Sequence, residues 1–150
     1  MNYYENLNKV IDTIEENLTN KIEYKELAKI VGTSAYTLQR IFAFLTGITL
    51  TDYIRKRRLS RAAEELLSSD IKIIDLALKY QYDSPVSFSN SFKKMHGISP
   101  KLLRKSNETI KIFPKIEFKP TIETIEKLHK MVAIIRIQRN ITISTTRNLL

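Results

Sequence analysis

The chain has 150 residues, of which 43% are hydrophobic, and a formal net charge of +9 at pH 7. This length and composition predict one compact domain with a buried core and an appendage, and they exclude two full-sized domains. The absence of cysteine excludes disulfides and thiolate metal sites, and the two histidines, His96 and His129, are far apart in sequence. We therefore expect neither a cofactor nor a metal site.

The charge is unevenly distributed along the chain. Residues 1–31 have four Lys/Arg and six Asp/Glu, whereas residues 32–106 have thirteen Lys/Arg and six Asp/Glu, an excess of +7. This excess favours a polyanionic partner for the middle of the chain. Apolar runs are too short to cross a membrane, and the first six residues are unlike a signal peptide. A cytoplasmic protein without a membrane partner is expected.

The first predicted elements form a helix-turn-helix pattern preceded by another helix. Apolar residues between positions 7 and 18 recur at helical spacing, which predicts the leading helix. A short helix around Leu27 then precedes a tight turn, and a second helix begins at the N-cap Ser34 and ends at Gly47. Two helices joined by a tight turn are typical of helix-turn-helix units.

A long connecting helix is predicted next, ending at about Ser68. Thr49 and Asp52 resemble a capping box at its start, and apolar residues keep the helical spacing as far as Leu67. At 1.5 Å per residue this helix would be roughly 28 Å long. It would hold the helices on either side about one turn of DNA apart, near ~34 Å.

The helix-turn-helix pattern is then repeated. After both Ser34 and Ser84, apolar residues follow four and eight positions later and a glycine follows thirteen positions later. Ser84-Pro85 and Ser99-Pro100 each combine an N-cap with proline at the first helical position, which predicts the starts of a second recognition helix and of a short closing helix.

Taken together, these residues resemble the AraC/XylS transcriptional regulators over roughly residues 4–105. The resemblance implies an all-α fold, a seven-helix tandem helix-turn-helix domain that spans residues 1–106 and reads double-stranded DNA in two adjacent major-groove segments. Family members commonly activate transcription, which implies RNA polymerase as a further partner. The positions that carry the resemblance are Leu27-Ala28, Ser34, Leu38-Gln39-Arg40, Phe42, Gly47, Tyr53-Ile54-Arg55, Arg58-Leu59, Ala62-Ala63, Leu66-Leu67, Ile74, Leu78, Phe88-Ser89, Phe92-Lys93-Lys94 and Gly97-Ile98-Ser99-Pro100.

The resemblance implies base-reading positions in the first recognition helix. These are Ala35, Tyr36, Thr37, Gln39 and Arg40. Their chemistry agrees, because glutamine pairs with adenine, arginine pairs with guanine and an aromatic ring covers a thymine methyl group. The alternative for Gln39 and Arg40 is a solvated helix face.

The second recognition helix is less typical of the family. Family members often have longer polar or basic side chains at its outward positions, and a glycine where this chain has Gln81. We expect this helix to read fewer bases, and the alternative is that it mainly contacts the DNA backbone. Its outward positions are Val86, Ser87, Ser89 and Asn90.

Phosphate contacts are expected from the basic residues around the connector and at the end of the second recognition helix. The basic residues between Arg55 and Arg61 span more than one helical turn, so one or two should instead pair with acidic neighbours such as Asp52 or Glu65. The expected phosphate contacts are Arg55, Arg57, Arg58, Lys93 and Lys94.

Residues 107–150 form a β-prone C-terminal extension. Residues 109–113 and 116–118 alternate like strands, and residues 131–137 form a continuous apolar strand candidate. The extension resembles the start of the gyrase-inhibitor-like effector domain found in some AraC-type regulators, and we favour a truncated domain of this kind. A small-molecule effector would bind only if that domain were complete. A packed hairpin and a basic flexible tail are the alternatives.

The sequence contains no catalytic motif. It has no glycine-rich phosphate loop and no HExxH motif, and His96 lies at a predicted helix end. We therefore expect no enzyme. Two other functions stay open, a constitutive fragment of a ligand-sensing regulator and a protein-interaction module on a helix-turn-helix scaffold. The basic motif region and the Gln39-Arg40 pair favour DNA.

Overall fold

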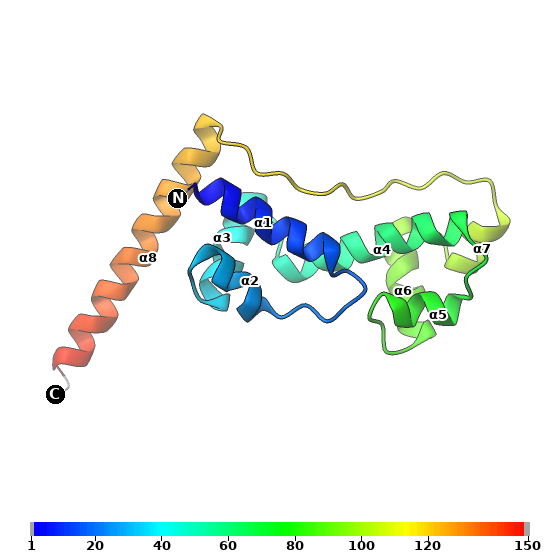
Figure 1. Cartoon of the computed structure of the whole chain (residues 1–150), viewed down its shortest axis with the longest axis horizontal. Coiled ribbons are helices and arrows are strands. Elements are labelled where there is room, and N and C mark those ends of the chain that lie inside the picture. The colour runs from blue at the N-terminus through cyan, green and yellow to red at the C-terminus, as the bar shows by residue number, and fades with distance from the viewer. Residues whose placement is uncertain (1, 149–150) are drawn as a thin grey trace.

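The computed structural model describes residues 2–148, with side chains as far as Arg139. This part of the chain is all-α, as predicted, and contains no β strand. Figure 1 shows α4 joining one helical unit built from α1, α2 and α3 to a second built from α5, α6 and α7. The helices are α1 (Tyr3–Glu16), α2 (Tyr24–Val31), α3 (Ala35–Thr46), α4 (Leu50–Ser68), α5 (Ile73–Lys79), α6 (Pro85–His96), α7 (Pro100–Lys105) and α8 (Ile122–Asn148).

The predicted caps fix both recognition helices, α3 and α6. Each of the two ends at a glycine with a left-handed backbone, Gly47 at φ 76° and Gly97 at φ 75°. Four helices begin at a hydroxyl that accepts a backbone N–H three residues later, Ser34 for α3, Thr49 for α4, Ser84 for α6 and Ser99 for α7. The two halves of the repeat therefore begin and end in the same way.

Each unit has its own hydrophobic core, and α4 contributes to both. The start of α4, including Leu50 and Tyr53, packs with α1, α2 and α3. Its second half, including Leu59 and Leu66, packs with α5, α6 and α7. Because the two cores share one continuous 19-residue helix, that helix sets the separation of the units.

Residues 107–121 form an extended segment, the strap, that runs back along the molecule from α7 to α8 (Figure 1). Side chains bind its backbone: Ser60 Oγ accepts from Phe113 N at 2.9 Å, and the Asn8 amide bonds both N and O of Phe118 at 2.7 and 2.9 Å. The Phe118 ring packs edge-on against Phe42, with centroids 6.1 Å apart. The predicted strands at 109–113 and 116–118 are therefore wrong, since the segment is extended but pairs with no other strand.

The strand predicted at residues 131–137 is also wrong, because this segment lies in the middle of the 27-residue helix α8. Leu128 and Met131 are buried in the first core, and Val132 and Ile135 pack partly against it. These positions also have helical spacing, so a continuous apolar run suited either structure. Residues 107–148 thus form the strap and the helix α8. Among the described residues, no helix is both long and apolar enough to cross a membrane.

Candidate nucleic-acid interface

The first recognition helix, α3, has one face in the core and the other at the surface. Leu38 is fully buried, whereas Tyr36 is 69% exposed. The Arg40 guanidinium lies 5.5 Å from the centroid of the Tyr36 ring and donates to Gln138 Oε1 of α8 at 2.6 Å. The Gln39 amide instead donates to the carbonyl of residue 35 in its own helix, at 3.2 Å. Tyr36 and Arg40 thus form one surface, while Gln39 must rotate before it can reach a base.

Two of the predicted base-reading hydroxyls take part in helix capping. Ser34 Oγ donates to Thr37 Oγ1 at 3.0 Å, which leaves the Thr37 proton available to a ligand. Ser87 Oγ accepts from Ser84 Oγ at 3.1 Å and donates its own proton to the Ser84 carbonyl at 2.9 Å. Ser87 therefore offers a ligand only acceptor capacity.

The outward face of α6 is shorter and less polar than that of α3. Val86 is 69% exposed, Ser87 and Asn90 are exposed, and Ser89 is partly exposed. Below them, Phe88 packs edge-on against Tyr82 with ring centroids 5.3 Å apart. The structure thus brings the four predicted residues of α6 to the surface. Of the five predicted residues of α3, Tyr36 is exposed, Thr37, Gln39 and Arg40 are partly exposed, and Ala35 packs partly against the first core.

Two of the arginines expected to contact phosphate are used inside the domain. Arg57 is only 7% exposed, and its Nε and Nη2 donate to the two carboxylate oxygens of Glu15 at 2.7 and 2.8 Å. Arg58 is partly buried and donates to the carbonyls of Leu18 and Asn20, both at 2.8 Å. These bonds join α4 to α1 and to the segment that follows it. Because these hydrogen bonds occupy both guanidinium groups inside the domain, Arg57 and Arg58 are unsuited to contact phosphates.

Arg55, Lys93 and Lys94 have surface positions. The Arg55 guanidinium is 2.7 Å from Asp52, the acidic neighbour expected from the sequence. This hydrogen bond holds the pKa of Asp52 below its usual value, with smaller effects from the Lys56 and Lys94 charges. Arg55 and Lys56 of α4 line one surface hollow together with Lys94 of α6. Glu65, the other expected partner, binds Lys79 and Tyr80 instead.

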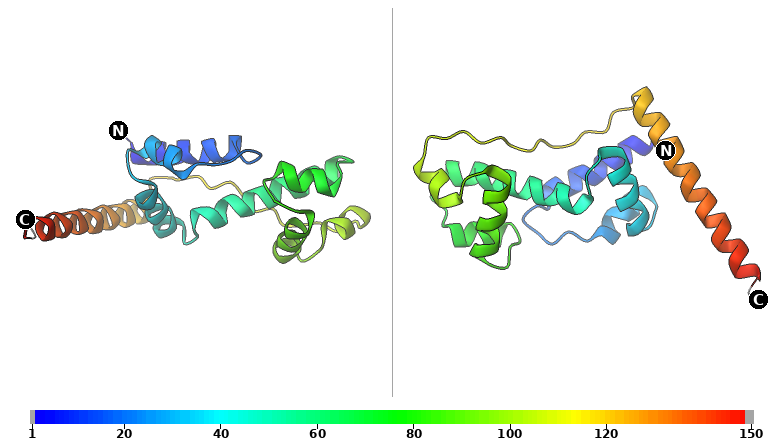
Figure 2. Two further views of the ribbon diagram at one scale, coloured as in Figure 1. Left: turned by 90° about the horizontal axis from the view of Figure 1, so that it is seen from below. Right: turned by 180° about the vertical axis from the view of Figure 1, so that it is seen from behind.

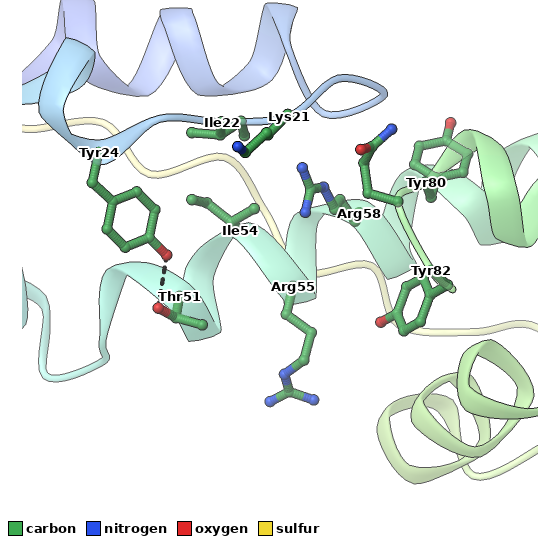
Figure 3. A pocket seen from close by; sticks show the side chains of 10 residues that line it. Lys21, Ile22, Tyr24, Thr51, Ile54, Arg55, Arg58, Tyr80 and Tyr82 are labelled. Carbon is green, nitrogen blue, oxygen red and sulfur yellow. Dashed lines mark hydrogen bonds between the residues drawn. The ribbon is translucent and has the colours of Figure 1, made fainter. Parts of the chain in front are cut away.

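A cleft of about 420 Å³ lies between the two units (Figure 3). Tyr24 of α2 and Thr51 of α4 meet there through a 2.7 Å bond between their hydroxyls. Figure 3 shows Arg58 pointing towards the segment between α1 and α2, whereas Arg55 extends away from it. The full lining is Lys21, Ile22, Tyr24, Thr51, Ile54, Arg55, Arg58, Tyr80, Gln81 and Tyr82.

Sequence reasoning missed the cleft residues Lys21, Tyr24 and Tyr82, because they come from separate segments and belong to no motif. Gln81, which stands at the cleft edge where family members have a glycine, has a left-handed backbone with φ 68°. Its amide donates to the Thr19 carbonyl at 2.8 Å, which joins the second unit to the first. This left-handed turn thus connects the second unit to the first at the edge of the cleft.

The remaining side chains with a potential for metal or acid–base chemistry are His, Asp and Glu. No group of His, Asp and Glu among residues 2–139 is arranged to hold a metal ion. His96 is half-buried, with Nε2 at 3.1 Å from the Leu59 carbonyl, and burial lowers its pKa. Its ring packs at a tilt against Phe92 with ring centroids 4.4 Å apart, which agrees with a packed histidine at a helix end.

Comparisons with known proteins agree with this arrangement. The family described as helix-turn-helix domain matches residues 27–106. The HTH-type transcriptional activator AarP of Providencia stuartii is 40% identical over 114 residues, which are 73% of this chain and 84% of AarP. An AraC-type regulator structure from Chromobacterium violaceum has a TM-score of 0.63 at 25% identity and covers 67% of this chain and 90% of its own. The DNA-binding domain of AdpA, solved with a target DNA, has a TM-score of 0.60 at 27% identity. The match covers 66% of this chain and 89% of the AdpA chain. With its two capped helix-turn-helix units on one connecting helix, the chain belongs to the AraC/XylS family of DNA-binding transcriptional regulators.

Proposed function

We propose that one copy of the chain reads two neighbouring major-groove segments of double-stranded DNA, here called half-elements, with α3 and α6. The observation that carries this proposal is the attachment of both recognition helices, identically capped, to the single helix α4. Figure 2 shows α3 and α6 on the side of the molecule away from α1. Such a rigid pair matches grooves about one turn apart without a second subunit.

In the first half-element, Arg40 and Tyr36 are the main base-reading residues in this proposal. The guanidinium of Arg40 suits guanine O6 and N7, and the exposed Tyr36 ring suits a thymine methyl group. Gln39 pairs with adenine after leaving the carbonyl of residue 35. Thr37 donates its hydroxyl proton, and Ala35 provides close approach to the groove floor.

In the second half-element, Val86 and Asn90 carry the readout, and Ser89 supports them. Ser87 accepts from an amino group of adenine or cytosine, because its own proton is committed to the Ser84 carbonyl. Fewer and shorter polar groups on α6 imply weaker sequence preference there than for α3.

Phosphates are bound by the basic residues that stay at the surface, Arg55, Lys93 and Lys94. Lys21 and the hydroxyls of Tyr24 and Tyr82 line the cleft between the units, where they would meet the backbone between the two half-elements. The closeness of Arg55 and Lys94, which line one surface hollow, supports this assignment.

A protein contact is a second function that one observation favours. Ile74 and Leu78 of α5 are 51% and 56% exposed and lie one helical turn apart on the same face. Leu67 and Leu102 of the same unit are also more than half exposed. We propose that this apolar surface contacts a protein such as RNA polymerase, and that both act in the cytoplasm.

The test is selection of a random duplex pool by the full chain at near-physiological salt, followed by sequencing. We expect an asymmetric motif with two half-elements about one turn apart. Arg40→Ala should weaken the binding free energy by about 1–3 kcal/mol and relax the sequence preference at one base pair of the first half-element. Asn90→Ala should relax the sequence preference only in the second half-element. Lys93→Gln should weaken all sequences evenly and lower the salt slope by about one.

Arg61→Ala is the matched control for Arg40→Ala, because Arg61 is exposed and pairs with Glu64 in α4 at 3.0 Å. Its selected motif should equal that of the unsubstituted chain. Retention of DNA without an enriched motif would refute sequence-specific reading. Failure to retain any duplex would leave the protein contact as the better function.

A further inference from the structure

Helix α8 lies against the first recognition helix, although neither helix-turn-helix unit requires it. Leu128 and Met131 anchor α8 in the first core. One turn beyond the last partly buried position, Gln138 reaches the side chain of Arg40, 98 residues away in sequence, at 2.6 Å. Because Arg40 belongs to the base-reading surface of α3, α8 borders the surface proposed to receive DNA.

The orientation of α8 agrees with this contact. Viewed from behind in Figure 2, α8 lies on the near side of the molecule together with α3 and α6, while α1 is on the far side. The helix continues thirteen residues past Ile135, its last position packed against the core, to Asn148. At 1.5 Å per residue this projecting part is about 20 Å long, over half of one DNA turn.

The charge of α8 indicates which partner suits it. No acidic residue follows Glu126 in the helix. Lys130, Arg136 and Arg139 are exposed, and within residues 2–139 none of them forms an ion pair, whereas Lys127 is paired with Glu123 at 2.7 Å. A helix that occupied the DNA site as a mimic of DNA would present carboxylates. A basic helix beside the recognition surface instead complements phosphates.

We propose that α8 is a third DNA-contacting element, which binds the phosphates flanking the first half-element through Arg136 and Arg139. Gln138 acts as a positioning residue, because its side-chain oxygen accepts from the Arg40 guanidinium and orients it for its base. The proposal rests on the proposed function and extends it, since the footprint becomes longer on the α3 side than on the α6 side.

The experiment compares the full chain with Arg136→Gln/Arg139→Gln on two duplexes recovered by selection. One duplex ends at the outer edge of the first half-element, and the other continues for about ten more base pairs, one helical turn. On the longer duplex, loss of two phosphate contacts should lower the salt slope by about two and weaken binding roughly 5-fold per contact at 0.15 M salt. On the shorter duplex the double variant should bind like the unsubstituted chain.

The matched control is Lys9→Gln/Lys119→Gln, which removes the same charge from exposed positions on α1 and the strap. It should leave both affinities nearly unchanged. Gln138→Ala should alter preference at the base pair read by Arg40 without altering the salt slope. That combination separates a positioning role from a phosphate contact.

Equal loss on both duplexes, or tighter binding by the arginine double variant, would overturn the proposal. Tighter binding would mean that α8 obstructs the site. If the full chain enriches a motif but binds both duplexes equally, the role of α8 would be refuted and the proposed function would stand. A chain that enriches no motif would instead refute the proposed function itself.

Discussion

Arg57→Ala removes the link between α4, α1 and the strap, and it should strongly destabilise the fold. The arginine forms two hydrogen bonds with the Glu15 carboxylate and a third with the Phe113 carbonyl of the strap. Glu15 has only 17% of its side chain exposed. Without Arg57 its carboxylate keeps one protein donor, the Tyr53 hydroxyl at 3.3 Å.

The magnitude follows from these contacts. Breaking a buried ion pair by removing one partner costs about 3–5 kcal/mol, because the other charge stays buried. The remaining Tyr53 bond and the partial exposure of Glu15 favour the lower end of that range. Loss of the Phe113 carbonyl bond adds about 1 kcal/mol. We expect a decrease of about 4 kcal/mol, a large part of the 5–15 kcal/mol typical of a folded domain.

Urea unfolding followed by circular dichroism measures this decrease. The control is Arg61→Ala in the same helix, whose ion pair with Glu64 is about half exposed and should be worth less than about 1 kcal/mol. Limited proteolysis should also cut the strap faster in Arg57→Ala. If the two alanine variants were equally stable, the assignment of Arg57 to a structural ion pair would be refuted.

Two further predictions concern helix ends. Burial lowers the pKa of His96, so the unfolded chain takes up a proton first as pH falls through about 6.5; stability should therefore decrease between pH 7.5 and 5.5, and less in His96→Gln, as urea midpoints would show. An equal decrease in the variant would contradict this coupling. Gly47→Ala meets no atom within 4 Å, so its expected cost of about 1 kcal/mol is backbone strain alone, and Gly47→Asn should lose less. Equal losses in thermal unfolding would argue against strain.

The parts of the fold that the sequence predicted depend on local chemistry. Ser34 and Ser84 cap their helices and Gly47 ends α3 whatever the rest of the chain does, so spacing alone identified both units. The Arg57 side chain points into the domain because it binds Glu15, which lies 42 residues earlier in the chain. The neighbouring arginines of α4 have the same side chain and no local feature that sets them apart. Local patterns could not distinguish them.

The strands predicted for the C-terminal extension were wrong for a related reason. Alternation in the strap satisfied the pattern of a strand, but its backbone bonds go to Asn8, Ser60 and Tyr53 on distant helices. The contact of α8 with Arg40 is equally remote in sequence. Periodicity describes which side chains share a face, and it contains no information about the surface that this face will meet.

Because two cores share α4, the length of that helix determines both the distance and the relative rotation of the two units. A single residue inserted between Ile54 and Leu59 would rotate the second unit about 100° around the helix axis and move it 1.5 Å. The recognition helices would then address different sides of the duplex. Insertions of three or four residues would restore the orientation of the second unit to within about 60° and move it by about 5 Å. If the two units read DNA as proposed, single substitutions on α3 or α6 would change the bases that are read, whereas a change of operator spacing would require insertions or deletions of about one turn of α4.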